Sequence, residues 1–454
     1  MLEPAYQADV VIVGAGVAGL SAAHRLNSAG VTTVVLEAAP YVGGRMTTEK
    51  IDGFRLDRIG QLLSTSYPEL RLTPGLDVLA LRPFAPGVLV HADGRTHRAG
   101  EPAGGARGAL DAARAFVSPP RRPRQAVQAG APPVSRAFPP LGGALDQARL
   151  AAALGRIATV PVERLLARPE RPAGRALAAR GMPARTVEGF LRPLLAALLC
   201  DPDLTTSSRC ADLALRAFAA GRLCLPEGGA DTLPELLAAA LPPGTVRTGV
   251  RVTSVSTTSV TTAEHGELRC RAVLVATDAH AAAELLPGLR VPPFHPVTVV
   301  HHTADEAPSA EAALLLDADR RGPVAHTAVI SQVDPSRAPA GRALISSTIL
   351  GAPPADADRT VRAHLATLYG TATHRWELLA IHHTPAAVPA MPPPHDLRRQ
   401  VRLLAGLYVC GDHRDTSTVQ GALHSGRRAA AALLTDLGVT PAAATAPLST
   451  PTAA

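Results

Sequence analysis

The sequence predicts an α/β fold in which a parallel-sheet domain is assembled from three separated stretches of the chain, with mixed α+β insertions between them. Strand and helix signals alternate at the N-terminus, a strand signal returns near residue 245, and a buried strand followed by a helix comes near residue 407. The chain has 454 residues and is 46% hydrophobic. A core of this size needs no disulfide or metal for its stability.

The N-terminal βαβ unit is the clearest predicted element. Asp9–Val13 is an apolar, β-branched run typical of a buried parallel strand, Val17–Ala29 has apolar residues at helical spacing, and Thr32–Leu36 is a second strand. After residue 82 the sequence becomes rich in Ala, Arg and Pro. Within this region, Leu145–Ile157 and Thr186–Leu199 are predicted helices.

Further strands are predicted in the second half of the chain. Val246–Val255 and Arg271–Ala276 are apolar strand candidates, and residues 292–394 mix strand signals with Pro-rich turns. Leu407–Cys410 is a last buried strand, and Gly421–Leu437 is a helix that follows it. Two stretches lack such signals: Ser118–Pro140 is predicted to be an irregular loop, and the tail Thr440–Ala454 is predicted to be disordered.

Composition excludes several classes of protein. The net charge is +7, but the arginines are dispersed, and no zinc-finger spacing or recognition helix accompanies them, so we expect no nucleic-acid partner. Five cysteines without a C-x-x-C pair predict reduced thiols and no metal site. Residues 1–8 lack the basic region of a signal peptide, and the longest apolar run, Val10–Ala23, is too short to span a bilayer. We expect a cytoplasmic protein, with peripheral membrane contact left open.

A glycine motif at the first strand–helix junction predicts a dinucleotide site. Gly14, Gly16 and Gly19 form G-x-G-x-x-G, in which the glycines allow a tight turn, close approach of a pyrophosphate, and close packing of helix on strand. The helix N-terminus offers free N–H groups to the phosphates. Glu37, at the end of the second strand, can accept both hydroxyls of an adenosine ribose.

Later residues distinguish FAD from NAD, which share this motif. Gly44 and Arg45 follow Glu37 directly, and the arginine can neutralise the pyrophosphate from a second side. Gly60 and Gln61 can bring backbone and an amide towards a ring system. Only one G-x-G-x-x-G motif is present, so no nicotinamide-binding domain is expected, and electrons should enter the cofactor from the substrate.

With these motifs, the chain resembles the flavin-containing amine oxidase superfamily, which includes monoamine and polyamine oxidases, protoporphyrinogen oxidase and phytoene desaturases. The resemblance implies FAD as the cofactor and a discontinuous Rossmann-like FAD-binding domain with an inserted mixed α+β substrate domain. The expected FAD-binding segments are residues 8–81, 223–288 and 395–438; the substrate segments are 82–222 and 289–394, and residues 439–454 are the tail. The matching pieces are Asp9–Gly19, Glu37–Arg45, Leu56–Gln61, Leu225–Gly229, Val250–Val255 and Leu407–Arg428.

The resemblance also assigns cofactor-binding residues. In its last motif, Gly411 permits close approach, Asp412 can hold a ribityl hydroxyl, and Val419 opens a helix whose N-terminus points at the flavin. The catalytic side chains remain unknown, and His413 is a weaker candidate for a place near the flavin. The expected cofactor-binding residues are Gly14, Ala15, Gly16, Ala18, Gly19, Glu37, Ala38, Gly44, Arg45, Gly60, Gln61, Val252, Gly411, Asp412, Thr418, Val419 and Ala422.

Two departures from the amine oxidases bear on the substrate. Those enzymes place a lysine opposite flavin N5, whereas the only lysine here, Lys50, lies far from that position in the sequence. They also use aromatic side chains as a cage for the amine, whereas Ser417 and Thr418 occupy one of these places. Both departures favour an FAD-dependent dehydrogenase or desaturase acting on a C–H bond of an apolar, for example isoprenoid, small molecule. The electron acceptor is left open. An amine or protoporphyrinogen-type oxidase and a non-catalytic flavin-binding protein are the alternatives.

Overall fold

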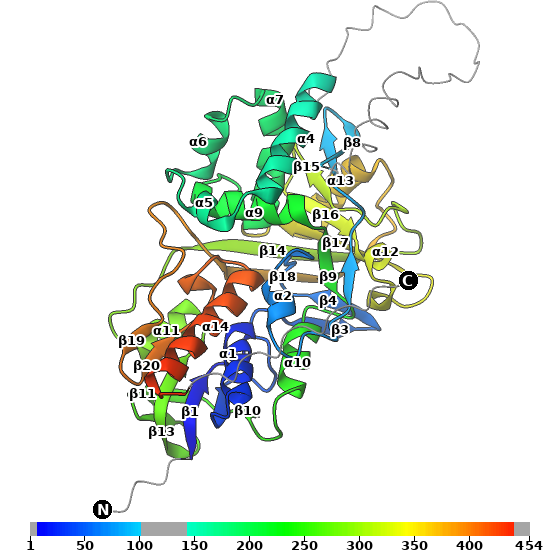
Figure 1. Ribbon diagram of the computed structural model, residues 1–454. Coiled ribbons are helices and arrows are strands. Elements are labelled where there is room, and N and C mark those ends of the chain that lie inside the picture. The colour runs from blue at the N-terminus through cyan, green and yellow to red at the C-terminus, as the bar shows by residue number, and fades with distance from the viewer. Residues whose placement is uncertain (1–6, 101–142, 440–454) are drawn as a thin grey trace, which may run out of the picture.

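The computed structural model describes residues 7–100 and 143–439, and these confirm the predicted α/β fold class (Figure 1). The predicted irregular loop Ser118–Pro140 and the predicted tail Thr440–Ala454 lie outside the described residues. Two large sheets organise the chain. None of the helices in the described ranges is long and apolar enough to cross a membrane.

The first sheet has eight strands and is built around β1, whose residues Val10–Ile12 are fully buried. Strands β10, β2, β1, β13 and β20 run parallel, and β13 also pairs antiparallel with β12. Parallel strands buried on both faces require apolar residues throughout, as the β1 sequence has. The strands are β1 (Ala8–Val13), β2 (Thr33–Glu37), β10 (Val246–Thr248), β11 (Val252–Val255), β12 (Ser259–Thr262), β13 (Gly266–Val275), β19 (Arg402–Leu404) and β20 (Leu407–Val409).

Helices α1 (Val17–Ser28) and α14 (Val419–Asp436) lie side by side against this sheet (Figure 1). Glycine permits their close approach, since a Cβ on Gly426 would lie 2.2 Å from the carbonyl oxygen of Ala18. Helix α10 (Thr232–Ala239) packs against α1 on the same side. The two long helices and the sheet enclose one large apolar core, and this core fixes where the first turn of α1 and the first turn of α14 meet.

The second sheet has seven strands in the order β18-β14-β17-β16-β15-β7-β8. It combines strands from residues 88–99 with strands from residues 294–389, so both expected insertions contribute to it. The strands are β7 (Val88–Ala92), β8 (Arg95–Ala99), β14 (Phe294–Ala304), β15 (Leu315–Asp317), β16 (His326–Val329), β17 (Ala343–Ile349) and β18 (Glu377–Pro389).

A group of helices covers the β7–β8 end of this sheet (Figure 1). The predicted helix Thr186–Leu199 is continuous but contains a π-helical turn at Val187–Leu191. Pro193 explains this turn, because a proline has no N–H to give to the preceding turn and its ring crowds the carbonyl there. The helices are α4 (Ala144–Thr159), α5 (Val162–Leu166), α6 (Ala173–Ala178), α7 (Ala184–Thr186), α8 (Arg192–Leu199) and α9 (Ser208–Ala220).

Smaller elements connect the two sheets. Arg337 is only 1% exposed and donates to Asp57 at 2.9 Å and to Asp334 at 3.2 Å. It thereby joins the end of β4 to the segment between α12 and η2. The remaining elements are β3 (Thr48–Ile51), β4 (Phe54–Asp57), β5 (Leu63–Ser64), β6 (Leu81–Pro83), β9 (Leu223–Pro226), α2 (Glu69–Leu72), α11 (Ala279–Leu285), α12 (Ile330–Val333), α13 (Ala357–Tyr369), and the 3₁₀ turns η2 (Pro335–Arg337) and η3 (Asp412–Arg414).

The prediction of one strand over Val246–Val255 was wrong. Gly249 adopts a left-handed φ of +71°, which ends β10 and turns the chain before β11. As a result β10 pairs parallel with β2, whereas β11 pairs antiparallel with β12. The predicted strand Arg271–Ala276 is the second half of β13, which begins at Gly266.

Several histidines are buried in the second sheet. His301 contacts the Asp57 carbonyl oxygen at 3.0 Å and the Ser346 hydroxyl at 2.8 Å, and His302 contacts the Asp358 carboxylate at 3.0 Å. His326 on β16 has no hydrogen-bond partner for Nδ1. Burial lowers the pKa of His301 and of His326 from 6.5 to about 4. These rings are therefore neutral in the folded protein at neutral pH.

This burial predicts that acid destabilises the fold. Between pH 6.5 and 4 the unfolded chain binds protons that folded His326 does not, so the free energy of unfolding falls as the pH falls. For one such histidine the loss is roughly 3 kcal/mol at the acid end. We expect His326→Gln to flatten the dependence of the melting temperature on pH in this window. The exposed His265→Gln variant is the control and should retain the wild-type slope; equal slopes in all three proteins would contradict the assignment.

Candidate active site

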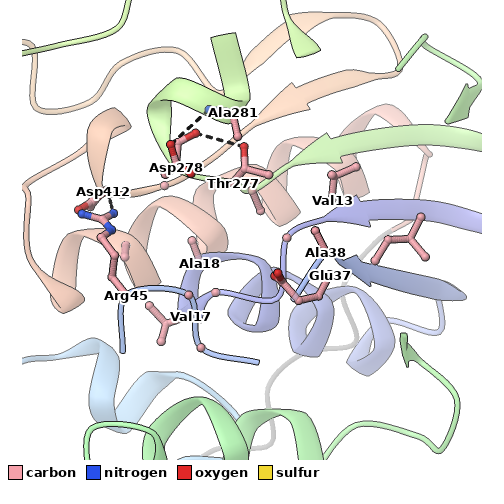
Figure 2. A pocket seen from close by; sticks show the side chains of 18 of the residues that line it. Val13, Val17, Ala18, Glu37, Ala38, Arg45, Thr277, Asp278, Ala281 and Asp412 are labelled. Carbon is pink, nitrogen blue, oxygen red and sulfur yellow. Dashed lines mark hydrogen bonds and ion pairs between the residues drawn. The ribbon is translucent and has the colours of Figure 1, made fainter. Parts of the chain in front are cut away.

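A cleft of about 580 Å³ opens at the carboxyl ends of β1, β2 and β13, between the first turns of α1 and α14 (Figure 2). Ligands of open α/β sheets bind at this edge. Fourteen of the seventeen residues expected at a cofactor site line it. They are Gly14, Gly16, Ala18, Glu37, Ala38, Gly44, Arg45, Gln61, Val252, Gly411, Asp412, Thr418, Val419 and Ala422.

The glycine turn shows why each small residue is needed. Gly14 has a φ of +105°, and a Cβ on it would lie 3.0 Å from the backbone of Ala276. A Cβ on Gly19 would lie 2.2 Å from the Gly14 carbonyl oxygen, so Gly19 serves helix packing and does not line the cleft. Gly16 differs, because a Cβ there would meet nothing within 4 Å. Gly16 is also the N-cap of α1 and has no side chain to occupy the helix N–H groups that face the cleft.

Two other expected residues also lie outside the cleft lining. Ala15 is fully buried, and its N–H donates to Glu37 Oε2 at 2.8 Å. Gly60 faces the second sheet, where a Cβ would lie 3.4 Å from Thr348 Oγ1. It lines a separate cavity of about 40 Å³ instead.

Glu37 ends β2 with its carboxylate held at one end of the cleft (Figure 2). Its Oε1 accepts the Ala39 N–H at 2.9 Å, while Oε2 accepts the Ala15 N–H. Both bonds come from backbone, so the orientation of the carboxylate is set by the turn after β1 and the turn after β2. A fixed acceptor at this place suits a ribose diol.

Arg45 and Asp412 form an ion pair at the other end of the cleft (Figure 2). Arg45 Nη2 lies 2.6 Å from Asp412 Oδ1, and Nη1 donates to the carbonyl oxygen of Ala387 at 2.8 Å. Burial opposes the charge of Arg45, but the Asp412 carboxylate outweighs it and raises the pKa of Arg45. The guanidinium thus connects the N-terminal segment, the C-terminal segment and strand β18.

Gln61 tests whether the cleft suits a flavin. Its Oε1 is buried and has no hydrogen-bond partner in the protein, although the residue lines the cleft. A buried acceptor without a partner costs about 1–3 kcal/mol, so a ligand that brings a donor would remove this penalty. Near it, Thr418 caps α14 by accepting the Gly421 N–H, which leaves the positive end of that helix facing the cleft. The residues that line the cleft therefore fit an extended dinucleotide whose polar ring lies at the end near Gln61 and Thr418.

Part of the cleft wall comes from residues outside the predicted set. Thr277, Asp278 and Ala281 line it, and Asp278 caps α11 by accepting from the Ala281 N–H at 3.2 Å (Figure 2). They follow β13, which pairs directly with β1. The carboxyl end of a neighbouring parallel strand was the signal that could have identified them. Met46, Val250, Arg251 and Thr253 also line the cleft and were not predicted.

His413 does not line the cleft, although the sequence made it a candidate. Its ring packs beneath Gly411, and neither ring nitrogen has a hydrogen-bond partner. Burial lowers the pKa of His413 to about 4, so the ring is neutral. His382 and His383 are also accounted for by structure, through Glu49 at 2.8 Å and Thr298 at 2.9 Å. Within the described ranges, no group of three or more His, Cys, Asp or Glu side chains could hold a metal ion.

Comparison with known proteins identifies the family. Residues 17–434 match the flavin-containing amine oxidoreductase family, and the chain belongs to it. It is accordingly an FAD-dependent oxidoreductase. Among curated proteins, it is 50% identical over 68 residues to a putrescine oxidase from Kocuria rosea and 37% identical over 62 residues to a pseudooxynicotine dehydrogenase from a Pseudomonas species. These matches cover 15% and 14% of this chain, and only 14% and 12% of the two relatives.

Solved structures show the same fold over nearly the whole chain. An oxidoreductase from Methanosarcina mazei superposes with a TM-score of 0.69 at 16% identity, covering 92% of this chain and 99% of that one. Putrescine oxidase bound to putrescine gives a TM-score of 0.65 at 18% identity, covering 95% and 100%. Cyclohexylamine oxidase from Brevibacterium oxydans gives the same TM-score and identity, covering 95% and 99%.

Because the space beside Gly16 is open, a larger residue there should leave the fold intact but prevent binding of the cofactor. In Gly16→Val the Cβ meets nothing within 4 Å in the protein, and the branched side chain extends into the cleft, where the pyrophosphate is expected. We expect the melting temperature of the flavin-free protein to be unchanged and the flavin content of purified protein to fall at least tenfold. Gly143→Val, at the N-cap of α4 away from the cleft, is the matched control. A yellow Gly16→Val protein with full flavin content would contradict this placement.

Proposed function

We propose that this FAD-dependent oxidoreductase is a dehydrogenase or desaturase that removes a hydride from a C–H bond of an apolar substrate, an isoprenoid being one example. We further propose that an acceptor other than oxygen reoxidises the cofactor. The observation that carries this proposal is the place of the only lysine. Lys50 is exposed on β3 and does not line the cleft, so no ammonium group can face the flavin ring.

The residues around Thr418 support the same proposal. The family resemblance puts an aromatic cage residue just before the last helix, but here Thr416, Ser417 and Thr418 are small. The Ser417 hydroxyl donates to the Pro389 carbonyl oxygen at 2.6 Å, and the Thr416 and Thr418 hydroxyls contact each other at 3.0 Å. Their polar atoms are thus engaged within the protein, and none of the three offers an aromatic face to an amine nitrogen.

In the proposed mechanism, the bound flavin supplies the hydride acceptor. Glu37 holds the ribose hydroxyls, and the N–H groups of the first turn of α1 hold the pyrophosphate. The Arg45–Asp412 pair would hold the cofactor at the end of the cleft opposite Glu37. The first turn of α14 presents its positive end where negative charge develops. The apolar cluster of Ile59, Val297, Val299, Ala387 and Val388 packs β14 and β18 against the segment that carries Gln61.

Amine oxidation is the alternative within the family, and the relatives give it support. Putrescine oxidase and cyclohexylamine oxidase are among the proteins that this chain resembles, as is a protoporphyrinogen oxidase from Exiguobacterium. A non-catalytic flavin-binding protein is the alternative from another class. It would require a cofactor ring that no substrate can reach.

The proposal predicts a poor oxidase towards amines. Without a lysine ammonium group near the ring, reoxidation by oxygen loses an electrostatic stabilisation that can change a rate by ~10²–10³. We expect the reduced protein to react slowly with air but readily with a quinone or an artificial dye.

Two assays in parallel test this expectation. One measures peroxide formed with a panel of primary amines and polyamines, and the other measures dye-linked turnover with apolar polyenes, with free FAD as the blank in both. Robust amine-dependent peroxide release would overturn the dehydrogenase proposal and establish the amine oxidase alternative.

A further inference from the structure

A second pocket, of about 290 Å³, lies between α2, α5, α9 and the first turn of α14. It shares Thr418 with the cofactor cleft, so both spaces reach the N-cap of α14. In Figure 1, α5 and α9 lie above α14. We propose that this pocket binds the substrate and that it accepts an uncharged, elongated apolar molecule. The proposal rests on the proposed function and names the substrate class of that site.

The lining is mainly apolar. Aliphatic and thioether side chains from α2, α5, α8, α9 and the segment after β18 form its walls, and Leu72 on α2 is 51% exposed at the edge. An exposed leucine beside an apolar pocket is the surface that an apolar ligand would cover. The side chains are Leu72, Val162, Leu166, Leu199, Leu213 and Met391.

The two buried carboxylates in the lining, Glu69 and Asp415, are already paired, which argues against a cation deep in the pocket. The exposed Glu163 lies towards solvent on α5. The Glu69 carboxylate, whose side chain is 1% exposed, lies 2.7 Å from Arg427 Nη2. The Asp415 carboxylate lies 2.9 Å from His424 Nδ1 and 3.2 Å from Arg428 Nη1. An ammonium group would have to displace an arginine to reach either carboxylate, and breaking a buried pair is costly.

Small side chains lie between the pocket and the cleft. Met391 lies against the Ser417 backbone, with its sulfur 3.3 Å from the Ser417 nitrogen. Thr418 lines both spaces, and Thr416 lines the pocket only. A bulky aromatic residue at Thr418 would fill this junction. With threonine there, one end of a ligand in the pocket can reach the flavin end of the cleft.

The test measures binding to the flavin-loaded enzyme, independently of turnover. Displacement of the apolar dye Nile red reports affinity, and the change in the flavin absorption spectrum reports whether the ligand reaches the ring. Three ligands with the same chain but different charge are compared: 1-decanol, decylamine and decanoate. We expect decanol to bind at least tenfold more tightly than decylamine and to perturb the flavin spectrum.

Variants locate the site. Ala214→Trp on α9 places an indole in the pocket and should weaken Nile red binding at least tenfold, with flavin content unchanged. Ala220→Trp, exposed on the same helix and outside the lining, is the matched control. If Ala214→Trp fails to fold, Leu72→Glu at the rim replaces it, because this residue is half exposed and should tolerate a charge while repelling an apolar ligand.

The outcomes separate this inference from the proposed function. Unchanged Nile red binding in the folded pocket variants, or tighter binding of decylamine than of decanol, would overturn the pocket assignment. Peroxide release with amines, alongside decanol binding that Ala214→Trp abolishes, would overturn only the dehydrogenase proposal. Decanol binding that leaves the flavin spectrum unchanged would also overturn the inference, since the ligand would not reach the ring.

Discussion

The site depends on how closely the first turn of α1 approaches the backbone around it. Gly19 lies against the Gly14 carbonyl, and Gly426 brings α14 to within contact of Ala18. A single Cβ at either position would separate elements that are now in van der Waals contact. Because the approach is this close, the free N–H groups of α1 and the capped end of α14 face the same cleft, and two helix dipoles act on one ligand.

Charged side chains then attach the second sheet to this framework. Arg45 bonds both Asp412 and the Ala387 carbonyl of β18, and Arg337 joins Asp57 to Asp334. Both guanidiniums have several fixed partners, which suits the planar, multiple-donor geometry of arginine better than that of lysine. The second sheet is thereby held in a defined position relative to the side of the cleft that the cofactor-binding motifs form.

The sequence predicted correctly those elements whose conformation depends on neighbouring residues. The run Asp9–Val13, the glycine turn and Glu37 specify strand, turn and acceptor from neighbouring residues alone, and they lie together in the structure. Asp278 and the second pocket could not be predicted in this way. They arise from pairing between strands more than 250 residues apart and from the placement of α9 and α14 around one pocket, which no spacing in the sequence records. Gly249 is a different case. Its left-handed conformation is a local property, but the residues around it predicted one continuous strand.

The cleft draws its walls from three separated regions, around residues 13–61, 250–285 and 411–422. A ligand in the cleft therefore touches parts of the chain that are far apart in sequence. Because it binds only when all three regions are in place, it stabilises the folded state against any opening that moves one of them away. Loss of the cofactor should accordingly loosen α1, α11 and α14 together.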